Sequence, residues 1–370
     1  MNPAIVIDGR GYFTGGGIGR YTRQILPALV EECRSCGLSV RVLISNQHRP
    51  DEVELPGGGR VEVVVSRAEW MDATSEPLRL PAEVEGAGLF HSLSGHWVPD
   101  AGPSIATIHD LTPRMRPELM SADARFHGER VVEAARRATW RIAVSRTAAD
   151  DLRRVLGPGA QPLSVIPEAA APLFHGAVAD PNVLGRYGLT AGEYLLTVGA
   201  GHAHKNVAGL VEAYLTSGVV APLVIVGAIR QGAQEVARLL AQPSLSRRVF
   251  MPGVVSDVDL AALYAGSRLF VSASLREGFG LPVLEAMAAG APVVATRSAS
   301  GADLGGDAAF WVDPAETRAL ASAIAQLDRD PMRRSELARR GRIRAGQYSW
   351  ARTAAMTSTL YSAMTEVRAA

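Results

Sequence analysis

Residues 269–296 read LFVSASLREGFGLPVLEAMAAGAPVVAT, and this stretch contains one complete repeat of the fold. An apolar run over 269–274 is followed by a glycine-containing turn, a helical stretch over 282–289 and a second apolar run over 292–296. Short apolar runs that alternate with helices are typical of parallel strands covered by helices. The stretch therefore predicts a strand–helix–strand unit, with Glu277 just after the first strand and Glu285 inside the helix.

The same alternation extends over most of the 370 residues. In the first half, strands are predicted at 4–8, 39–45, 61–65, 88–92, 104–110 and 140–145, and helices at 18–35, 121–138 and 146–156. In the second half, strands are predicted at 194–199, 222–227, 248–253, 269–274 and 292–296, and helices at 206–217, 231–242, 257–266 and 282–289. Residues 157–193, rich in proline, glycine and alanine, have the composition of a linker. The sequence thus predicts two doubly wound α/β domains, with ligand sites at the carboxyl ends of their strands.

Composition and charge exclude several classes of function. The formal net charge of +1 argues against a nucleic-acid-binding protein that works through bulk electrostatics. No apolar run approaches the roughly 20 residues that span a bilayer, and the first residues lack the features of a signal peptide. We therefore expect a cytoplasmic location. Cys33 and Cys36 form a C-x-x-C without the two further ligands of a zinc site, and are interpreted as structural or incidental thiols.

The stretch GHAHKN, residues 201–206, contains the one lysine of the chain. The other 37 of its 38 basic residues are arginines. A compact ammonium on a flexible stem fits a crowded anionic pocket where a planar guanidinium would clash. Lys205 is therefore a candidate for binding an anionic ligand, and chance survival in an arginine-biased chain is the alternative.

Two motifs in the first half point to the same kind of ligand. Gly15, Gly16, Gly17 and Gly19 precede a predicted helix, whose backbone amides can meet an anionic group. A turn that needs positive φ is the alternative. The spacing is not that of a dinucleotide fingerprint, which disfavours a dehydrogenase. In TIHDLTP, His109 ends an apolar strand beside Asp110 and is placed to hydrogen-bond a ligand; a buried structural histidine is the alternative.

Two further patterns favour structural interpretations. Asp257 and Asp259 form a D-x-D of the kind that binds divalent metal in some sugar-transferring enzymes, but with Ser256 they read as a helix capping box. We therefore predict no catalytic metal and no cofactor. In the helix predicted over 18–35, Arg20, Arg23 and Arg34 allow a weak peripheral contact with the inner face of a membrane. Glu31 and Glu32 on the same helix favour a solvated face instead.

Assembled, these motifs resemble family 4 of the glycosyltransferases, the retaining GT-B enzymes also called glycosyl transferases group 1. The resemblance is carried by GGIGRYT, TIHDL, HKN, GGDAAFWVDP and, most specifically, the E-x7-E element of Glu277 and Glu285. It implies two Rossmann-like domains facing across a cleft. Residues 1–175 would form the acceptor-side domain and 186–349 the nucleotide-sugar domain, with 350–370 crossing back to the first.

The resemblance also implies roles for single residues. Glu277 and the amides of the next four residues would contact the donor sugar and phosphate, Glu285 would hold the ribose hydroxyls, and His109 would face the sugar near the reacting carbon. Lys205 would neutralise the diphosphate. The implied catalytic residues are His109, Lys205 and Glu277, and the implied donor-binding residues are Gly16, Gly17, His204, Lys205, Glu277, Gly278, Phe279, Gly280, Leu281 and Glu285.

The implied activity is metal-independent transfer of a hexose, with mannose among the candidates, from a nucleotide-diphosphate sugar with retained configuration. The acceptor would be a hydroxyl of a glycan, glycolipid or small molecule, in cell-surface glycan or natural-product biosynthesis. A GT-B epimerase or phosphorylase and a non-catalytic nucleotide-sugar-binding protein are the alternatives. The chain departs from the family at three places: His204 replaces an arginine, Glu168 and Ala169 replace Asn-Gly, and Asp303 replaces a glutamate.

Overall fold

The computed structural model describes residues 5–44, 53, 55, 61–65, 87–99, 102–157, 162–199, 201–228, 238, 245, 248–298 and 301–366. The chain forms two compact units. The first unit comprises Met1–Met115, Arg125–Glu168 and Ser349–Ala370, and the second comprises Arg116–Ala124 and Ala169–Tyr348. Each unit is built on its own parallel sheet, as the alternation of apolar runs and helices predicts.

The sheet of the first unit has seven parallel strands in the order β3-β2-β1-β4-β5-β6-β7. Every residue of β1, β4 and β5 is buried, as expected for strands covered by helices on both faces. All six predicted strands are confirmed. The strands are β1 Ile5–Asp8, β2 Val40–Ile44, β3 Val61–Val65, β4 Leu89–Ser92, β5 Ser104–Ile108, β6 Trp140–Ala143 and β7 Leu163–Val165.

The interpretation of residues 157–193 as a linker was wrong. This stretch contains strand β7, a short 3₁₀ turn at Pro172–Phe174 and helix α5, Pro181–Arg186. Strand β7 is only three residues long, and it adds the last strand to the first sheet by pairing with β6. Proline and glycine on either side of so short a strand gave the stretch its loop-like composition.

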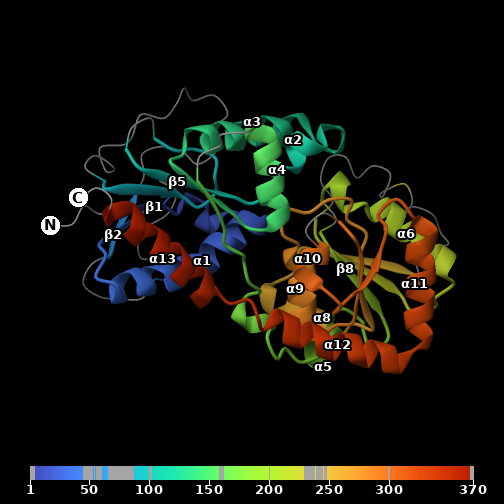
Figure 1. Cartoon of the computed structure of the whole chain (residues 1–370). Coiled ribbons are helices and arrows are strands. Elements are labelled where there is room, and N and C mark those ends of the chain that lie inside the picture. The colour runs from blue at the N-terminus through green and yellow to red at the C-terminus, as the bar shows by residue number, and fades with distance from the viewer. Residues whose placement is uncertain are drawn as a thin grey trace. The chain divides into compact units, whose positions relative to one another are not determined.

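Helices cover the first sheet, and the last helix of the chain belongs to this unit. Helix α13 packs against α1 and β4, and the two helices lie side by side (Figure 1). The hydroxyl of Thr353 on α13 donates to the carbonyl of Pro167 at 2.7 Å. The helices are α1 Gly16–Ser35, α2 Thr112–Met115, α3 Ala122–Arg137, α4 Arg146–Leu156 and α13 Trp350–Glu366, with a 3₁₀ turn at Arg10–Phe13. The 3₁₀ turn Pro117–Leu119 and the first residues of α3 are counted with the second unit.

The second sheet has six parallel strands in the order β10-β9-β8-β11-β12-β13. The five predicted strands are confirmed, and β13 was not predicted. The strands are β8 Leu195–Val198, β9 Leu223–Val226, β10 Val249–Gly253, β11 Leu269–Ser272, β12 Val293–Thr296 and β13 Phe310–Val312. The helices are α5 Pro181–Arg186, α6 Val207–Ser217, α8 Asp257–Gly266, α9 Leu281–Ala289, α10 Gly301–Gly305, α11 Thr317–Arg329 and α12 Pro331–Ala345. The predicted helix 231–242 lies outside the described residues except for position 238.

Both sheets contain a point at which the order of their strands reverses. In the first sheet it lies between β1 and β4, which pair directly, and in the second between β8 and β11, where Leu195 lies opposite Leu269. In open parallel sheets, ligands bind outside the carboxyl ends of the strands at such a switch point. The loops that follow β1, β4, β8 and β11 are therefore the places to look for a site.

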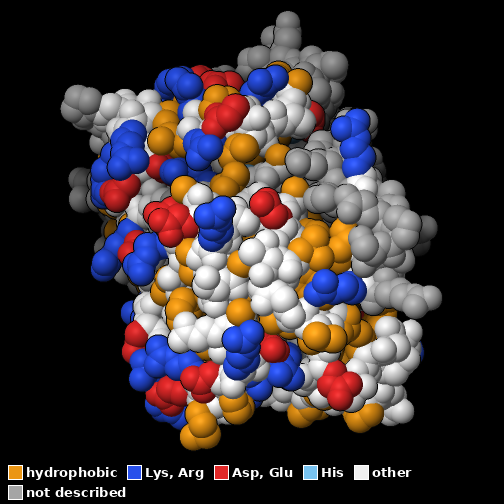
Figure 2. All heavy atoms as spheres, turned by 90° about the vertical axis from the view of Figure 1, so that its right-hand side faces the viewer, with side chains coloured by type: hydrophobic (Ala, Val, Ile, Leu, Met, Phe, Trp, Pro, Cys, Tyr) orange, Lys and Arg blue, Asp and Glu red, His pale blue; other side chains and the backbone are white. Residues whose placement is uncertain are grey.

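On the face that includes α11, the charged side chains of the described residues are of both signs. Figure 2 shows arginine side chains interspersed there with aspartate and glutamate. This mixture agrees with the near-zero net charge of the chain. Among the helices that the structure describes, none has the length and apolar character needed to cross a membrane.

Candidate functional site

Lys205 and Glu277 meet at the switch point of the second sheet. Lys205 ends the 3₁₀ turn Ala203–Lys205 that follows β8, and Glu277 lies in the loop after β11. The ammonium of Lys205 donates to Oε1 of Glu277 at 2.6 Å, and the two side chains are 16% and 14% exposed. The two loops are also joined by their backbones, because the Leu275 N–H donates to the His204 carbonyl at 2.7 Å. Two residues predicted separately thus form one ion pair.

The stem of Lys205 runs close beside the backbone that leaves β8. Gly199 has φ +103°, and a Cβ built on it would lie 3.3 Å from Cε of Lys205. Only glycine readily adopts that backbone conformation, and a side chain there would also press on the lysine stem. The space beside Gly199 therefore suits an unbranched chain ending in a small cation, which is what separates lysine from arginine.

The charges of this pair are set by their surroundings. Burial alone would raise the pKa of Glu277, but the charge of Lys205 and the hydrogen bond that it donates bring the pKa below the ordinary glutamate value. Next to it, burial and then the charge of Lys205 lower the pKa of His204 to about 4. His204 is therefore neutral at pH 7. The position where the family carries an arginine holds no permanent charge in this chain.

Helix α9 begins beside this pair. Gly280 is its N-cap with φ +101°, no side chain of the described residues caps it, and its first turn contains no acidic residue. Pro282 has no N–H, and the Val283 and Leu284 N–H groups donate to the Gly280 carbonyl, so the amides of Gly280 and Leu281 are the ones that can donate to an anion here. Phe279 is buried and packs edge-on against Tyr348 at 6.1 Å between ring centroids, which fixes the turn that leads into Leu281. The predicted start at a proline is confirmed, since Pro282 is in the first turn.

Glu285 lies inside helix α9 and is fully buried. The hydroxyl of Tyr264, from the neighbouring helix α8, donates to its Oε2 at 3.2 Å. A carboxylate with 0% exposure cannot reach a ligand in this state of the protein. Its role in holding ribose hydroxyls stays a prediction, and that role requires the side chain to become accessible.

The D-x-D element is a helix cap, as predicted. Ser256 is the N-cap of α8, and its Oγ accepts from the Asp259 N–H at 3.1 Å. The Asp259 carboxylate accepts from Arg186 Nη2 and from the Tyr187 hydroxyl, each at 2.6 Å, which ties α5 to α8. Within the described parts of the chain, no cluster of three or more His, Cys, Asp or Glu could hold a metal ion.

In the first unit, the glycine loop leads from β1 into helix α1. Gly19 lies so near the preceding loop that a Cβ would meet the Thr14 carbonyl oxygen at 1.8 Å. Arg23 holds the same loop by donating from Nη1 to the carbonyls of Tyr12 and Thr14. By contrast, no atom lies within 4 Å of a Cβ built on Gly15, Gly16 or Gly17, and of these only Gly16, with φ +81°, needs glycine for its backbone. Local packing therefore does not explain why Gly15 and Gly17 are glycines.

Two other expectations for this unit concern α1. Arg34 forms an exposed ion pair with Glu31 at 2.6 Å, as the interpretation of a solvated face expects. Arg23, also considered for membrane contact, donates to the carbonyls of Tyr12 and Thr14. Cys33 is buried, Cys36 is exposed, and both are free thiols.

His109 follows β5 and is held through both ring nitrogens. Its Nδ1 lies 2.7 Å from Oε1 of Glu168, and its Nε2 lies 2.7 Å from the Leu93 carbonyl oxygen. Tyr21 of α1 packs edge-on against the ring, with centroids 4.5 Å apart. The neighbouring Asp110 has a structural role, because it accepts from the N–H and hydroxyl of Thr112 at the start of α2. Sequence reasoning noticed Glu168 as a departure from the family but assigned it no partner.

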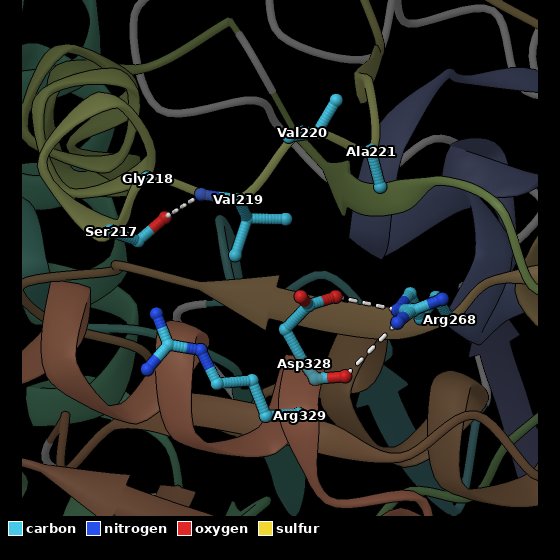
Figure 3. A pocket seen from close by; sticks show the side chains of 8 residues that line it. All are labelled: Ser217, Gly218, Val219, Val220, Ala221, Arg268, Asp328 and Arg329. Carbon is cyan, nitrogen blue, oxygen red and sulfur yellow. Dashed lines mark hydrogen bonds and ion pairs between the residues drawn. The ribbon is translucent and has the colours of Figure 1, made fainter.

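One well-formed pocket lies elsewhere in the second unit (Figure 3). It has a volume of about 270 Å³, and Arg268 and Asp328 form an ion pair of 2.6 Å in its wall. The segment before β9 and the residue before β11 line it, so it lies at the amino ends of these strands, on the edge opposite Lys205 and Glu277. Its lining residues are Ser217, Gly218, Val219, Val220, Ala221, Arg268, Asp328 and Arg329. It is therefore separate from the candidate site.

The chain is similar to a known family and to several known proteins. The profile of the family described as glycosyl transferases group 1 matches residues 189–344, which contain Lys205, Glu277 and Glu285. The O-antigen chain mannosyltransferase B of Escherichia coli is 29% identical over 265 residues, covering 70% of each chain. The serotype-specific mannosyltransferase WbdA of Escherichia coli is 27% identical over 68% of this chain, which corresponds to only 32% of its own length.

Solved structures share the fold over nearly the whole chain. Sucrose-phosphate synthase from Thermosynechococcus elongatus superimposes with a TM-score of 0.77 at 22% identity, covering 99% of this chain and 100% of that one. HepE from Anabaena in complex with UDP-glucose superimposes with a TM-score of 0.72 at 19% identity, covering 98% and 100%. At these identities the likeness shows the fold, which is GT-B: two Rossmann-like domains.

Proposed function

We propose that this chain, whose residues 189–344 match the glycosyl transferases group 1 family and whose fold is GT-B, is a retaining hexosyltransferase. The donor is a nucleotide-diphosphate sugar, with mannose as the first candidate sugar. The acceptor is a hydroxyl group of a growing cell-surface glycan or glycolipid. Glycosyl transfer itself is the activity of the family.

One observation carries the proposal: Lys205 and Glu277 are paired at the switch point of the second sheet, beside the free N-terminus of α9. A diphosphate needs positive charge and amide donors, and a sugar needs a hydrogen-bond acceptor for its hydroxyls. The Lys205 ammonium and the amides of Gly280 and Leu281 supply the positive charge and the donors for the diphosphate. The Glu277 carboxylate supplies the acceptor for the sugar hydroxyls. Because Glu277 is ionised, it can accept hydrogen bonds from two hydroxyls at once.

In the reaction, the bond between the anomeric carbon and the diphosphate oxygen breaks, and a bond from that carbon to the acceptor oxygen forms on the same face. The proton of the acceptor hydroxyl passes to the leaving phosphate. Negative charge grows on the diphosphate as its bond breaks, so Lys205 stabilises the transition state more than the bound donor. No side chain is assigned as a nucleophile.

The remaining donor contacts are part of the same proposal. Gly16 and Gly17 would supply amides to the phosphates, and no atom lies within 4 Å of a Cβ built on either residue, which leaves room for a ligand to approach the backbone. Glu285 would bind the ribose after its side chain becomes accessible. His204, neutral at pH 7, would contribute a hydrogen bond rather than a charge.

The choice of sugar and acceptor follows the relatives. Those similar over about two thirds of this chain are named as mannosyltransferases, two of them of an O-antigen chain. The HepE structure holds UDP-glucose, which supports a nucleotide-diphosphate sugar as the kind of donor. Action on the cytoplasmic side of a membrane, where such acceptors are assembled, is part of the proposal.

The experiment is transfer of radiolabel from a panel of nucleotide sugars, including GDP-mannose and UDP-glucose, to lipid-linked and soluble glycan acceptors. NMR of the product must show the anomeric configuration of the donor. An epimerase would convert the donor without acceptor, a phosphorylase would require free phosphate, and a binding protein would show a donor-dependent thermal shift without turnover. Any of these three outcomes would replace the proposed activity.

We predict that transfer needs no divalent metal. The Asp259 carboxylate, which in a D-x-D would bind the ion, accepts hydrogen bonds from Arg186 and Tyr187 and is largely buried. Transfer rates with excess EDTA should match those with Mg²⁺ or Mn²⁺ within about twofold, a difference of roughly 0.4 kcal/mol in activation free energy. Loss of transfer on chelation and its return with metal would contradict the assignment of this element to a cap.

A further inference from the structure

The first unit holds a second acid–base pair that no motif assigns, formed by His109 and Glu168. His109 follows β5 and Glu168 follows β7, two strands separated in the sheet only by β6. Nδ1 of the imidazole lies 2.7 Å from Oε1 of the carboxylate. The side chains are 13% and 4% exposed, so the carboxylate is buried while one part of the ring reaches the surface. The pair lies at the carboxyl edge of the sheet, where ligands of this fold bind.

The second contact of the ring determines where its hydrogen lies. Nε2 faces the Leu93 carbonyl oxygen at 2.7 Å, and a carbonyl oxygen can only accept. Nε2 therefore carries a hydrogen whether the ring is neutral or charged. Nδ1 and the Glu168 carboxyl group share one proton, and this proton is bound either to the ring or to the carboxyl group. Neither nitrogen keeps a lone pair for a substrate hydroxyl, so His109 cannot serve as a general base.

The ring is also held by packing. Tyr21 lies edge-on against it, and Trp350 lies edge-on against Tyr21 at 5.5 Å between centroids. Burial, and after it the charge of Glu168, raise the pKa of Tyr21, which places the carboxylate close to this aromatic ring as well. Two hydrogen bonds and one aromatic contact thus determine the plane of the imidazole.

We propose that Glu168 is a positioning residue for the proposed glycosyl transfer: through its hydrogen bond with Nδ1 it fixes the orientation of His109, so that the carbon edge of the ring is held in one place. The role of the fixed ring in glycosyl transfer rests on the proposed function. The positioning of the ring by Glu168 rests on the contacts of this chain. A family position that usually holds asparagine has here become a glutamate long enough to reach the histidine.

The test compares Glu168→Ala with Glu168→Gln in the full chain. A glutamine amide can donate to Nδ1 of the neutral ring or accept from it when charged, so Glu168→Gln keeps the hydrogen bond, whereas alanine removes it. We expect Glu168→Ala to lower kcat at least about tenfold with less than about threefold change in the KM for donor, because orientation matters most in the transition state. Glu168→Gln should recover kcat to within about threefold of the wild type.

A matched control and a spectroscopic measurement complete the test. Glu133→Gln changes a glutamate of the same unit that is 58% exposed, and should leave kcat and KM unchanged. ¹⁵N NMR of histidine-labelled protein, with the His109 signal identified by its loss in His109→Asn, should show a protonated Nε2 in the wild type and in Glu168→Gln. Glu168→Ala should keep the Nε2 hydrogen, which faces the Leu93 carbonyl, but should broaden the signals of the ring, because one of the two hydrogen bonds that hold it is lost.

The outcomes separate the two proposals. Equal activity of Glu168→Ala and the wild type, equal damage by alanine and glutamine, or an unprotonated Nε2 in the wild type would each overturn the positioning role. If no nucleotide sugar supports transfer while the NMR signals behave as expected, the proposed function fails and the assignment of Glu168 to His109 stands.

Discussion

Each unit of the protein places a base and a glutamate in contact at the carboxyl edge of its parallel sheet, but the two pairs are built differently. In the second unit, Lys205 brings a permanent charge to within 2.6 Å of Glu277, and both side chains are partly exposed. In the first unit, His109 lies 2.7 Å from a Glu168 that is only 4% exposed, and both ring nitrogens are bound. The first arrangement can rearrange around a ligand, whereas the second holds a ring still.

The difference reflects what each edge has to do. A lysine that is released from its glutamate when a diphosphate binds can follow the charge that grows on the leaving group, and the freed carboxylate can turn to the sugar. An imidazole fixed by a buried carboxylate offers shape instead of charge or proton transfer. The neutral His204 sharpens this contrast, because it leaves Lys205 as the permanent cation of the HKN element.

The largest effect is expected from breaking the pair of the second unit. Lys205→Ala removes charge stabilisation of the leaving group and leaves Glu277 buried without its cation, so kcat should fall about 10²-fold or more. Glu277→Ala should also lower kcat strongly. Because Lys205 contacts the diphosphate and Glu277 the sugar once donor is bound, the two losses in kcat should multiply in the double mutant. Steady-state kinetics of the cycle, with the exposed Arg333→Ala as control, would contradict this if the double mutant loses no more than either single mutant.

The sequence alone located Lys205 and Glu277, the pair of the second unit. It did not identify the pair of the first unit, His109 and Glu168. Lys205 is conspicuous as the chain's one lysine, and Glu277 stands at the end of an apolar strand before a glycine turn, so local patterns located both residues. The two doubly wound domains followed from the same alternation. Which loops meet, however, depends on the order of strands in the sheet, which periodicity does not specify.

Glu168 shows that limit most clearly. It follows a strand of three residues in a stretch whose proline and glycine content is typical of a linker, so the element that carries it was not recognised. Its partner is 59 positions away along the chain. Glu285 shows another limit: the motif located it on the correct helix, but its complete burial against Tyr264 depends on how α8 and α9 pack.

A smaller effect on kcat is expected from a substitution that tests why position 205 is a lysine. Lys205→Arg keeps the charge, but a guanidinium is broader, and the stem already passes close to Gly199. We expect normal folding and a loss in kcat of about tenfold, which is some 1.4 kcal/mol of transition-state stabilisation. The reverse exchange at an exposed site, Arg333→Lys, is the control. Wild-type kinetics from Lys205→Arg would show that shape is irrelevant there.

Glu285 should give an effect on binding rather than on turnover. Contacts to ribose are similar in the bound donor and the transition state, so Glu285→Gln should raise the KM for donor several-fold and change kcat by less than about threefold. Glu285→Ala should do the same and also lower the free energy of unfolding by about 1–3 kcal/mol, because it leaves the buried Tyr264 hydroxyl without its acceptor. A kcat loss matching that of Glu277→Ala would remove the distinction between the two glutamates.

The last expected effect is on stability in acid and not on turnover, and it compares the two units directly. Burial lowers the pKa of His91 to about 3 and of His96 to about 4 in the first unit, and of His204 to about 4 in the second. Unfolded histidine has a pKa of about 6.5. Between pH 6.5 and 4 the unfolded chain therefore binds protons that the folded chain does not. The free energy of unfolding must fall as the pH falls through this window, by at most about 1.4 kcal/mol per pH unit for each histidine.

Burial also lowers the pKa of His175 in the second unit. Because the lowering is largest for His91, in the first unit, acid should loosen that unit first. Hydrogen exchange followed by mass spectrometry at pH 7 and pH 5, corrected for the intrinsic rate, should show protection lost more from β4 and β5 than from β8 and β11. His96→Asn removes one titrating group and should reduce the loss in the first unit without altering the second. Equal loss in both units would mean that the buried imidazoles do not govern acid stability, and that the carboxylates, Glu277 among them, titrate first instead.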